Sequence, residues 1–387
     1  MTVHNPSKSH ELLGRDPVTG RSVRVAVVDG RVERIGDGPV GTSAWLSPGL
    51  VDLQVNGFGG LDVNGSDVTA DSIVELTRRL GLAGTTTFVP TVITASEADI
   101  VRSLQAVRDA RRLDPLTALA VPYVHVEGPH LSPQEGARGV HPVEHIRPPD
   151  LDELSRWQQA SDGLVGMVTL SPHHPEARDY TAAASAAGVR IAIGHTDAEP
   201  DQIRAVVDAG AVLSTHLGNG ARATLPRHPN HLWAQLADDR LTAGFIADGH
   251  HLGAEVLTAM TRAKGLSRSL LVSDSVALAG LPAGSYEAAV GGNVELSEDG
   301  RLAYVGTPYL AGAAQSLADG VAKATVLARL TLGEAVALAT TSPSRFVNGR
   351  GRVVPGESAN LVVFDWAPGD PTLTLRQVVQ GGLAVQP

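Results

Sequence analysis

Two histidines and two carboxylates stand where four apolar runs of the sequence end. Glu127 closes VPYVHVE, His195 closes VRIAIGH, His216 closes AVLSTH and Asp274 closes SLLVSD. Two histidines and one carboxylate from different strands form a three-ligand set that leaves a fourth metal position open for water. A second carboxylate beside such a set can take the proton from that water. The pattern therefore indicates metal-assisted hydrolysis, with Asp274 as the proton carrier.

Structural roles for the same residue types compete with this hypothesis. A single histidine at a strand end is more often a hydrogen-bonded structural residue than a ligand, and the chain has 14 histidines. Asp274 could instead be the N-cap of a helix, because a strand ends there. His125 is expected to pack in or beneath the sheet, and His173 and His174 stand in a loop without an obvious partner. The joint occurrence of all four residues at strand ends favours the catalytic site.

Eight apolar runs of strand length must position these residues, and most of them are separated by stretches with helical spacing. Near-continuous apolar strands separated by helices indicate a parallel sheet covered on both faces. Eight strands predict an α/β fold of the closed (β/α)8 barrel type, in which the C-terminal strand ends converge on one mouth. An open, doubly wound sheet is the alternative. The predicted strands are 50–56, 85–91, 121–130, 164–172, 189–197, 211–219, 241–251 and 269–275.

The two ends of the chain have β periodicity and no helical pattern. Residues 22–35 indicate two strands around a turn, and 351–366 and 372–385 have the same character. They predict a small β-sandwich module built from 1–47 and 349–387, around a catalytic barrel at 48–348. A hairpin insertion is expected at 285–306, followed by helices at 315–331 and 333–341. The segment NGFGG (56–60) lacks the spacing of a phosphate loop and is expected to form a turn.

Composition excludes several functional classes. The 387-residue chain is 43% hydrophobic with a formal net charge of −10, which argues against nucleic-acid and anionic-membrane partners. It has no cysteine, so thiol catalysis and thiolate–zinc sites are excluded. No apolar run is long enough for a membrane span, and the N-terminus lacks a signal-peptide pattern. We therefore expect a cytoplasmic protein.

An ordered set of motifs resembles the N-acetylglucosamine-6-phosphate deacetylases of the amidohydrolase superfamily. The resemblance covers nearly the whole chain, including the split β module, and the order of the motifs makes it specific. It implies a hydrolase that removes the acetyl group from an N-acetylated amino sugar, giving the amino sugar phosphate and acetate. The matching segments are PGLVDLQVNGFGG, HVEGPH, GVH, IGHTDA, THLGNGA, FIADGHH, VSDSVALAG, GTPYLAGAA and GRVVPGESANLVVFD.

The resemblance also implies a role for individual residues. Glu127, His195 and His216 would be the metal ligands, and Asp274 the general acid and base. His141, the histidine of GVH, would contact the substrate carbonyl. Arg227, in LPRHPN, would bind the phosphate in the neighbouring subunit's site, which implies a homodimer. The implied substrate-binding residues are His141, Asn219, Gly220, Arg227, Asp248, His251 and Leu310.

The chain departs from the superfamily pattern in its metal-site positions. Many amidohydrolases carry His-x-His on the first strand and a carboxylated lysine on the fourth, whereas this chain has Gln54 and Asn56 and no lysine within 164–172. Because amide side chains bind transition metals poorly, we expect one divalent metal per subunit. Zinc fits two histidines and one glutamate, and Fe²⁺, Mn²⁺ or Co²⁺ are alternatives.

Other departures concern the pocket wall. Gly218 and Gly220 stand where the family usually has an aromatic residue and alanine, and Ser273 and Ser275 flank the aspartate where TDA is common. These changes leave other substrates open, among them a different or unphosphorylated N-acetyl amino sugar. Cyclic-amide hydrolysis and deamination can use the same metal and aspartate. They remain alternatives because a fold alone does not fix the substrate. A non-catalytic binding protein is the remaining alternative, and such a protein would be expected to lack metal ligands.

Overall fold

The structure is a computed structural model that describes residues 9–287, 292–307 and 309–385. Eight parallel strands follow one another around a barrel in chain order. The barrel closes between its first and last strands, where the Asp274 amide donates to the Gln54 carbonyl at 3.0 Å and Val55 bridges to Ser275. The strands are β5 (Leu50–Val55), β8 (Thr85–Ile93), β9 (Val124–Glu127), β10 (Val165–Leu170), β11 (Arg190–Ile193), β12 (Leu213–Ser214), β13 (Thr242–Ile246) and β14 (Ser269–Val272).

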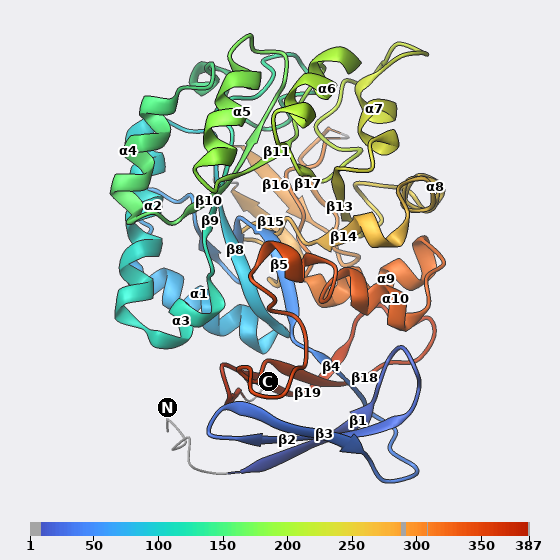
Figure 1. Cartoon of the computed structure of the whole chain (residues 1–387). Helices are drawn as coiled ribbons and strands as arrows, with labels where there is room; N and C mark the ends of the chain where they lie inside the picture. Colours follow the sequence, from blue (N-terminus) through green and yellow to red (C-terminus); the bar gives the residue numbers. More distant parts are fainter. Residues whose placement is uncertain (1–8, 288–291, 308, 386–387) are drawn as a thin grey trace.

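All eight predicted barrel strands are thus confirmed, and the doubly wound alternative is wrong. Helices surround the barrel (Figure 1). The first of them begins where the sequence caps it, because the Thr69 side chain accepts from the Ser72 amide in a capping box. The helices are α1 (Ala70–Leu82), α2 (Glu97–Leu113), α3 (Pro115–Ala120), α4 (Leu151–Ser161), α5 (Ala177–Ala186), α6 (Pro200–Asp208), α7 (His231–Ala237), α8 (Ala254–Lys264), α9 (Leu317–Leu327) and α10 (Leu332–Leu338).

Apolar side chains fill the barrel and the layer between its strands and helices. His125 is buried inside, as expected, with its Nε2 atom 2.7 Å from the Thr169 hydroxyl. His173 and His174, for which the sequence shows no obvious partner, each have one in the structure. His173 contacts the Ser171 hydroxyl at 2.7 Å, and His174 contacts the Leu131 carbonyl at 3.2 Å. Ser171 lies only two residues before His173, whereas Leu131 is 43 residues from His174 and is brought to it by the fold.

Both ends of the chain form one further sheet of seven strands, at the bottom of Figure 1, with a small apolar core of its own. The sandwich-like module predicted from the chain ends is therefore confirmed, while the boundaries 47/48 and 348/349 stay predictions. Its strands, in spatial order, are β20 (Leu383–Val385), β19 (Thr374–Gln380), β18 (Leu361–Asp365), β4 (Trp45–Pro48), β1 (His10–Arg15), β2 (Ser22–Val28) and β3 (Arg31–Asp37).

Two smaller sheets flank the mouth of the barrel. The NGFGG turn connects β6 (Gly57–Phe58) and β7 (Leu61–Asp62), which pair as a short hairpin. The predicted hairpin insertion is a three-stranded antiparallel sheet of β15 (Gly284–Glu287), β16 (Asn293–Leu296) and β17 (Leu302–Tyr304). Residues 288–291 of that insertion lie outside the described residues, as does residue 308 of GTPYLAGAA.

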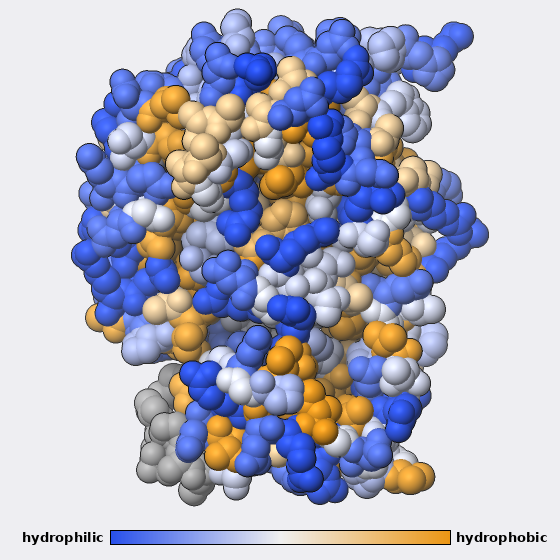
Figure 2. Space-filling model, in the orientation of Figure 1, coloured by the Kyte–Doolittle hydropathy of each residue, from blue (hydrophilic) through white to orange (hydrophobic). Residues whose placement is uncertain are grey.

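The outer surface is mainly hydrophilic on the face that Figure 2 shows, with apolar side chains gathered toward the β module. Across the described residues, no helix combines the length and apolar character that a membrane crossing requires.

Candidate active site

A cavity of about 530 Å³ opens at the C-terminal ends of the barrel strands. Its size is typical of a small-molecule site. Most of the predicted site residues meet there although they come from seven different segments of the chain. Those that line the cavity are Glu127, His141, His195, His216, Asn219, Gly220, His251, Asp274 and Leu310.

The three predicted metal ligands converge at the bottom of this cavity. The Glu127 Oε1 atom lies 2.9 Å from His216 Nε2 and 3.4 Å from His195 Nε2, and the two nitrogens are 3.1 Å apart. Ligands at about 2.0–2.1 Å from a tetrahedral zinc ion are themselves about 3.3–3.4 Å apart. The donor atoms therefore have the spacing that one small cation requires.

His141 adds a fourth donor to this cluster. Its Nε2 atom lies 3.2 Å from His195 Nε2, so Glu127, His141 and His195 also satisfy the distances of a metal-binding group. Short distances join all three pairs within Glu127, His195 and His216, whereas His141 approaches the cluster through His195. The geometry thus favours His216 as the third ligand and leaves His141 beside the open position.

The ring of His195 is fixed in the orientation that metal binding needs. Its Nδ1 atom lies 2.9 Å from the Ala137 carbonyl, to which it donates, and this tautomer leaves the Nε2 lone pair facing the cluster. Glycine backbones pack against the ring on two sides. A Cβ atom at Gly220 would lie 2.7 Å from His195 Nδ1, and one at Gly139 would lie 3.2 Å from His195 Cε1. The alanine usual in the family at position 220 would collide with His195 here.

Three of the four strand-end residues adopt left-handed backbone conformations. The φ angles are 46° for His195, 26° for His216 and 51° for Asp274. Such conformations cost about 1–3 kcal/mol at a residue with a side chain, and they gather at functional sites. They turn each side chain toward the cavity as the strand ends, a feature that the sequence does not reveal.

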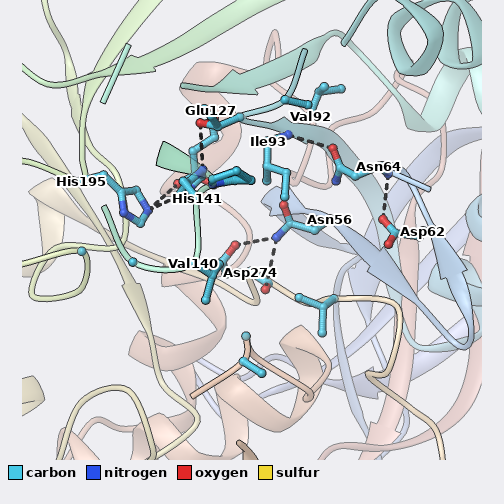
Figure 3. A pocket seen from close by; sticks show the side chains of 18 of the residues that line it. Asn56, Asp62, Asn64, Val92, Ile93, Glu127, Val140, His141, His195 and Asp274 are labelled. Carbon is cyan, nitrogen blue, oxygen red and sulfur yellow. Dashed lines mark hydrogen bonds and ion pairs between the residues drawn. The ribbon is translucent and has the colours of Figure 1, made fainter. Parts of the chain in front are cut away.

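Asp274 faces the cluster as a buried carboxylate. The Asn56 side chain donates to its Oδ1 atom at 2.8 Å (Figure 3). Burial, followed by the negative charge of Glu127, raises the pKa of Asp274 to about 6. A carboxyl group with a pKa near neutrality can both accept and return a proton. The N-cap alternative for Asp274 is wrong, because the described residues 275–283 that follow it form no helix.

Gln54 and Asn56 have a role that sequence reasoning missed. The Gln54 side chain donates to Glu127 Oε1 at 3.0 Å, as Asn56 does to Asp274. The two amides, predicted not to bind metal, instead orient the two functional carboxylates. The sequence signal for this role was the spacing of Gln54 and Asn56. Residues two apart in a strand point to the same side of a sheet, so both amides face the site.

The electrostatics of the cluster favour a positive charge at its centre. Burial raises the pKa of Glu127, but His195 and His216 lower it by more, so the carboxyl is ionised. Burial lowers the pKa of His216, but the Glu127 carboxylate outweighs this and raises it to about 9. Burial also lowers the pKa of His141 to about 3, which keeps that ring neutral. The negative charge of Glu127 favours a proton on His216, and a divalent cation bound between these groups would balance the same negative charge.

Two predicted substrate residues lie outside the lining of the cavity. Asp248 is buried behind His251, with its Oδ2 atom 2.6 Å from His251 Nδ1, so it orients that ring. Lys323 in turn donates to the Asp248 carbonyl at 3.0 Å. Arg227 is exposed on the segment between β12 and α7, and it makes no ion pair with any described residue.

Comparisons with known proteins agree with this geometry. The family model described as "Amidohydrolase family" matches residues 45–385. An N-acetylgalactosamine-6-phosphate deacetylase of Shewanella is 31% identical over 84% of this chain and 80% of its own length. An N-acetylglucosamine-6-phosphate deacetylase of Bos taurus is 31% identical over 83% of this chain and 79% of its own.

Solved structures give the same result. A mutant N-acetyl-D-glucosamine-6-phosphate deacetylase of Mycobacterium smegmatis, in complex with N-acetyl-D-glucosamine 6-phosphate, superposes with a TM-score of 0.86. It is 28% identical, and the match covers 98% of this chain and all of the other. The chain therefore belongs to the amidohydrolase family, and within it to the group that contains the N-acetylhexosamine-6-phosphate deacetylases.

Proposed function

We propose that this protein hydrolyses the acetamido group of an N-acetylhexosamine 6-phosphate, most directly N-acetylglucosamine 6-phosphate, to the amino sugar phosphate and acetate. One observation carries the proposal. Glu127, His195 and His216 present donor atoms within 3.4 Å of one another, and the same cavity holds Asp274 and His141. These are the groups that amide hydrolysis requires.

The donor set suits one divalent cation per subunit, and zinc is our proposal for it. The fit rests on the fixed tautomer of His195, on the ionised Glu127 and on the spacing of the three donors. When bound there, the cation would supply Lewis acidity and lower the pKa of water from about 15.7 toward about 7. Gln54 and Asn56 donate from their side-chain NH2 groups to Glu127 and Asp274 and hold those carboxylates in place.

Two residues of the chain then transfer the proton and stabilise the negative charge that develops on the carbonyl oxygen. Asp274 accepts a proton from the attacking water and aims its oxygen at the carbonyl carbon. His141 donates from Nε2 to the carbonyl oxygen, with the Thr94 hydroxyl holding its Nδ1 at 2.9 Å. Asp274 next gives its proton to the nitrogen as the C–N bond breaks, so acetate and a free amine leave. Removal of one oxyanion donor typically costs about 10²–10³ in rate.

The phosphate group is assigned to residues at the rim of the cavity. We propose that Arg227 from a second copy of the chain binds it, because arginine's planar fork matches phosphate oxygens. His251, held by Asp248, would contact the same end of the substrate, and Asn219 and Gly220 the sugar. This assignment makes the active form a homodimer, working in the cytoplasm on a small-molecule substrate.

The test is amine and acetate release from a small panel of sugars. N-acetylglucosamine 6-phosphate is expected to be hydrolysed with a higher kcat/KM than unphosphorylated N-acetylglucosamine. The galactosamine epimer is the second candidate, because the relatives include enzymes named for both. No release from any N-acetyl sugar, together with turnover of a cyclic amide or an aminated heterocycle, would assign another amidohydrolase reaction.

A further inference from the structure

One part of the cavity lies between β8, α2 and the loop at 140–145, beside the metal cluster. We call this part of the cavity the β8–α2 lobe, and define it by Ile93, Ala95, Ile100, Ser103 and Val140. The aliphatic side chains of Ile93, Ile100 and Val140 line it, and Ile93 and Val140 are labelled in Figure 3. No lysine or arginine lines the described part of the cavity.

The lobe lies on the side of the cluster away from the proposed sugar contacts. Asn219, Gly220 and His251 follow β12 and β13, whereas the lobe begins where β8 ends. In the barrel, β8 is separated from β12 by β9, β10 and β11. A sugar held by the β12 and β13 loops therefore leaves the lobe free for the other end of the scissile amide.

The geometry of an amide decides which part of the substrate reaches the lobe. The carbonyl carbon carries an oxygen, a nitrogen and the acyl chain. His141 receives the oxygen, and Asp274 must reach the nitrogen to protonate it. The third direction leads past Val140, which precedes His141, and past Thr94, whose hydroxyl contacts the His141 ring at 2.9 Å. Both residues line the cavity.

We propose, resting on the proposed function, that the β8–α2 lobe is an acyl-chain site that accepts groups longer than acetyl. The substrate class is then N-acyl hexosamine 6-phosphates with short aliphatic acyl groups, propionyl and butyryl included. Water adds to the carbonyl carbon, the C–N bond breaks, the amine takes the proton, and propionate or butyrate leaves. Each methylene buried against aliphatic walls strengthens binding about fourfold.

Charge sets the limit of this class. Asp62 and Asp99 also line the cavity, and the Asp99 carboxylate is already paired with Arg102 at 2.6 Å. An acyl group ending in a carboxylate, such as succinyl, would bury that charge without a partner against Ile93, Ile100 and Val140, which is costly. The lobe is therefore selective for uncharged chains.

The experiment measures amine release from glucosamine 6-phosphate carrying formyl, acetyl, propionyl, butyryl or succinyl groups. Wild type is expected to show kcat/KM for propionyl and butyryl within about tenfold of acetyl, and poor turnover of succinyl. Ala95→Leu and Ser103→Leu fill the lobe from two sides, and each should lower the butyryl-to-acetyl ratio about tenfold or more. Ala98→Leu, at an exposed position of α2 outside the cavity, is the matched control and should keep the wild-type ratio.

Each outcome bears on the proposal. Wild-type turnover of butyryl below about one-hundredth of acetyl would overturn it. A ratio unchanged in both filled variants, each with a wild-type melting transition, would also overturn it. Release of amine from none of the compounds, acetyl included, would overturn the proposed function itself. Should one filled variant not fold, the other measures the ratio alone.

Discussion

Adding a single methyl group at Gly220 should disturb the metal site, because Gly220 packs against the ring of His195. In Gly220→Ala the added methyl carbon would lie 2.7 Å from His195 Nδ1 and 3.0 Å from its Cε1, well inside van der Waals contact. The backbone is also left-handed, with φ of 56°, which costs alanine about 1–2 kcal/mol. To relieve this overlap, the His195 ring must shift by roughly 0.5–1 Å. The shift weakens its hydrogen bond to the Ala137 carbonyl and moves Nε2 away from the other metal-binding atoms.

The loss should appear first in metal affinity. Disturbing the partner that orients a metal-binding histidine typically costs about 10–100-fold in affinity, so Gly220→Ala is expected to lose zinc in that range. Isothermal titration of the chelator-treated protein with zinc measures it, alongside acetate release at limiting and saturating metal. Activity should recover in part at saturating zinc.

Gly218→Ala is the matched control on the same loop. Its backbone is equally strained, with φ of 101°, but its methyl group would meet the flexible ends of Leu252 and Met260. It is expected to lower the melting temperature without changing zinc affinity. Wild-type zinc affinity and kcat/KM in Gly220→Ala would refute the view that Gly220 holds His195 in place.

Three further predictions follow from the same geometry. Asp274→Asn should lower kcat by about 10²–10⁴ and retain one equivalent of metal by mass spectrometry, and loss of metal would contradict its role as proton carrier. Arg227→Ala should lower kcat/KM about 10–100-fold for the phosphorylated sugar alone, and equal losses for the unphosphorylated sugar would exclude a phosphate contact. Burial raises the pKa of Asp52 from 3.8 to about 7. Since the folded state then holds the proton that the unfolded chain has released, stability should fall as pH rises from about 4 to 7, by at most about 1.4 kcal/mol per unit. Chemical unfolding at several pH values should show this slope reduced in Asp52→Asn, and an identical slope would contradict the assignment.

The barrel was predictable because its strands are marked by a local property. Each strand is a near-continuous apolar run. Segments such as Leu50–Val55 and Thr85–Ile93 therefore predict buried parallel strands without any tertiary information. The convergence of Glu127, His195, His216 and Asp274 follows from the same rule, since parallel strands end at one mouth. The three-stranded sheet was seen only as a hairpin, because its strands are short and partly exposed.

Contacts between loops could not be predicted from the sequence. Ala137, Gly139 and Gly220 surround His195, yet they come from segments far apart in the chain, and glycine carries no chemical signal. The partnership of Gln54 with Glu127 depends on the register between β5 and its neighbours around the barrel. Left-handed backbone at His195 and His216 likewise has no residue-type signature, because both are histidines rather than glycines.

We propose that one metal held by Glu127, His195 and His216 enables hydrolysis of an N-acetylhexosamine 6-phosphate. The most direct test of this proposal is acetate release from N-acetylglucosamine 6-phosphate by chelator-treated protein as zinc is added in measured steps. Activity should be absent at the start, rise linearly and level off at one equivalent per chain. Full acetate release without metal would contradict a metal-dependent reaction, and a rise that continues to two equivalents would contradict a single metal site.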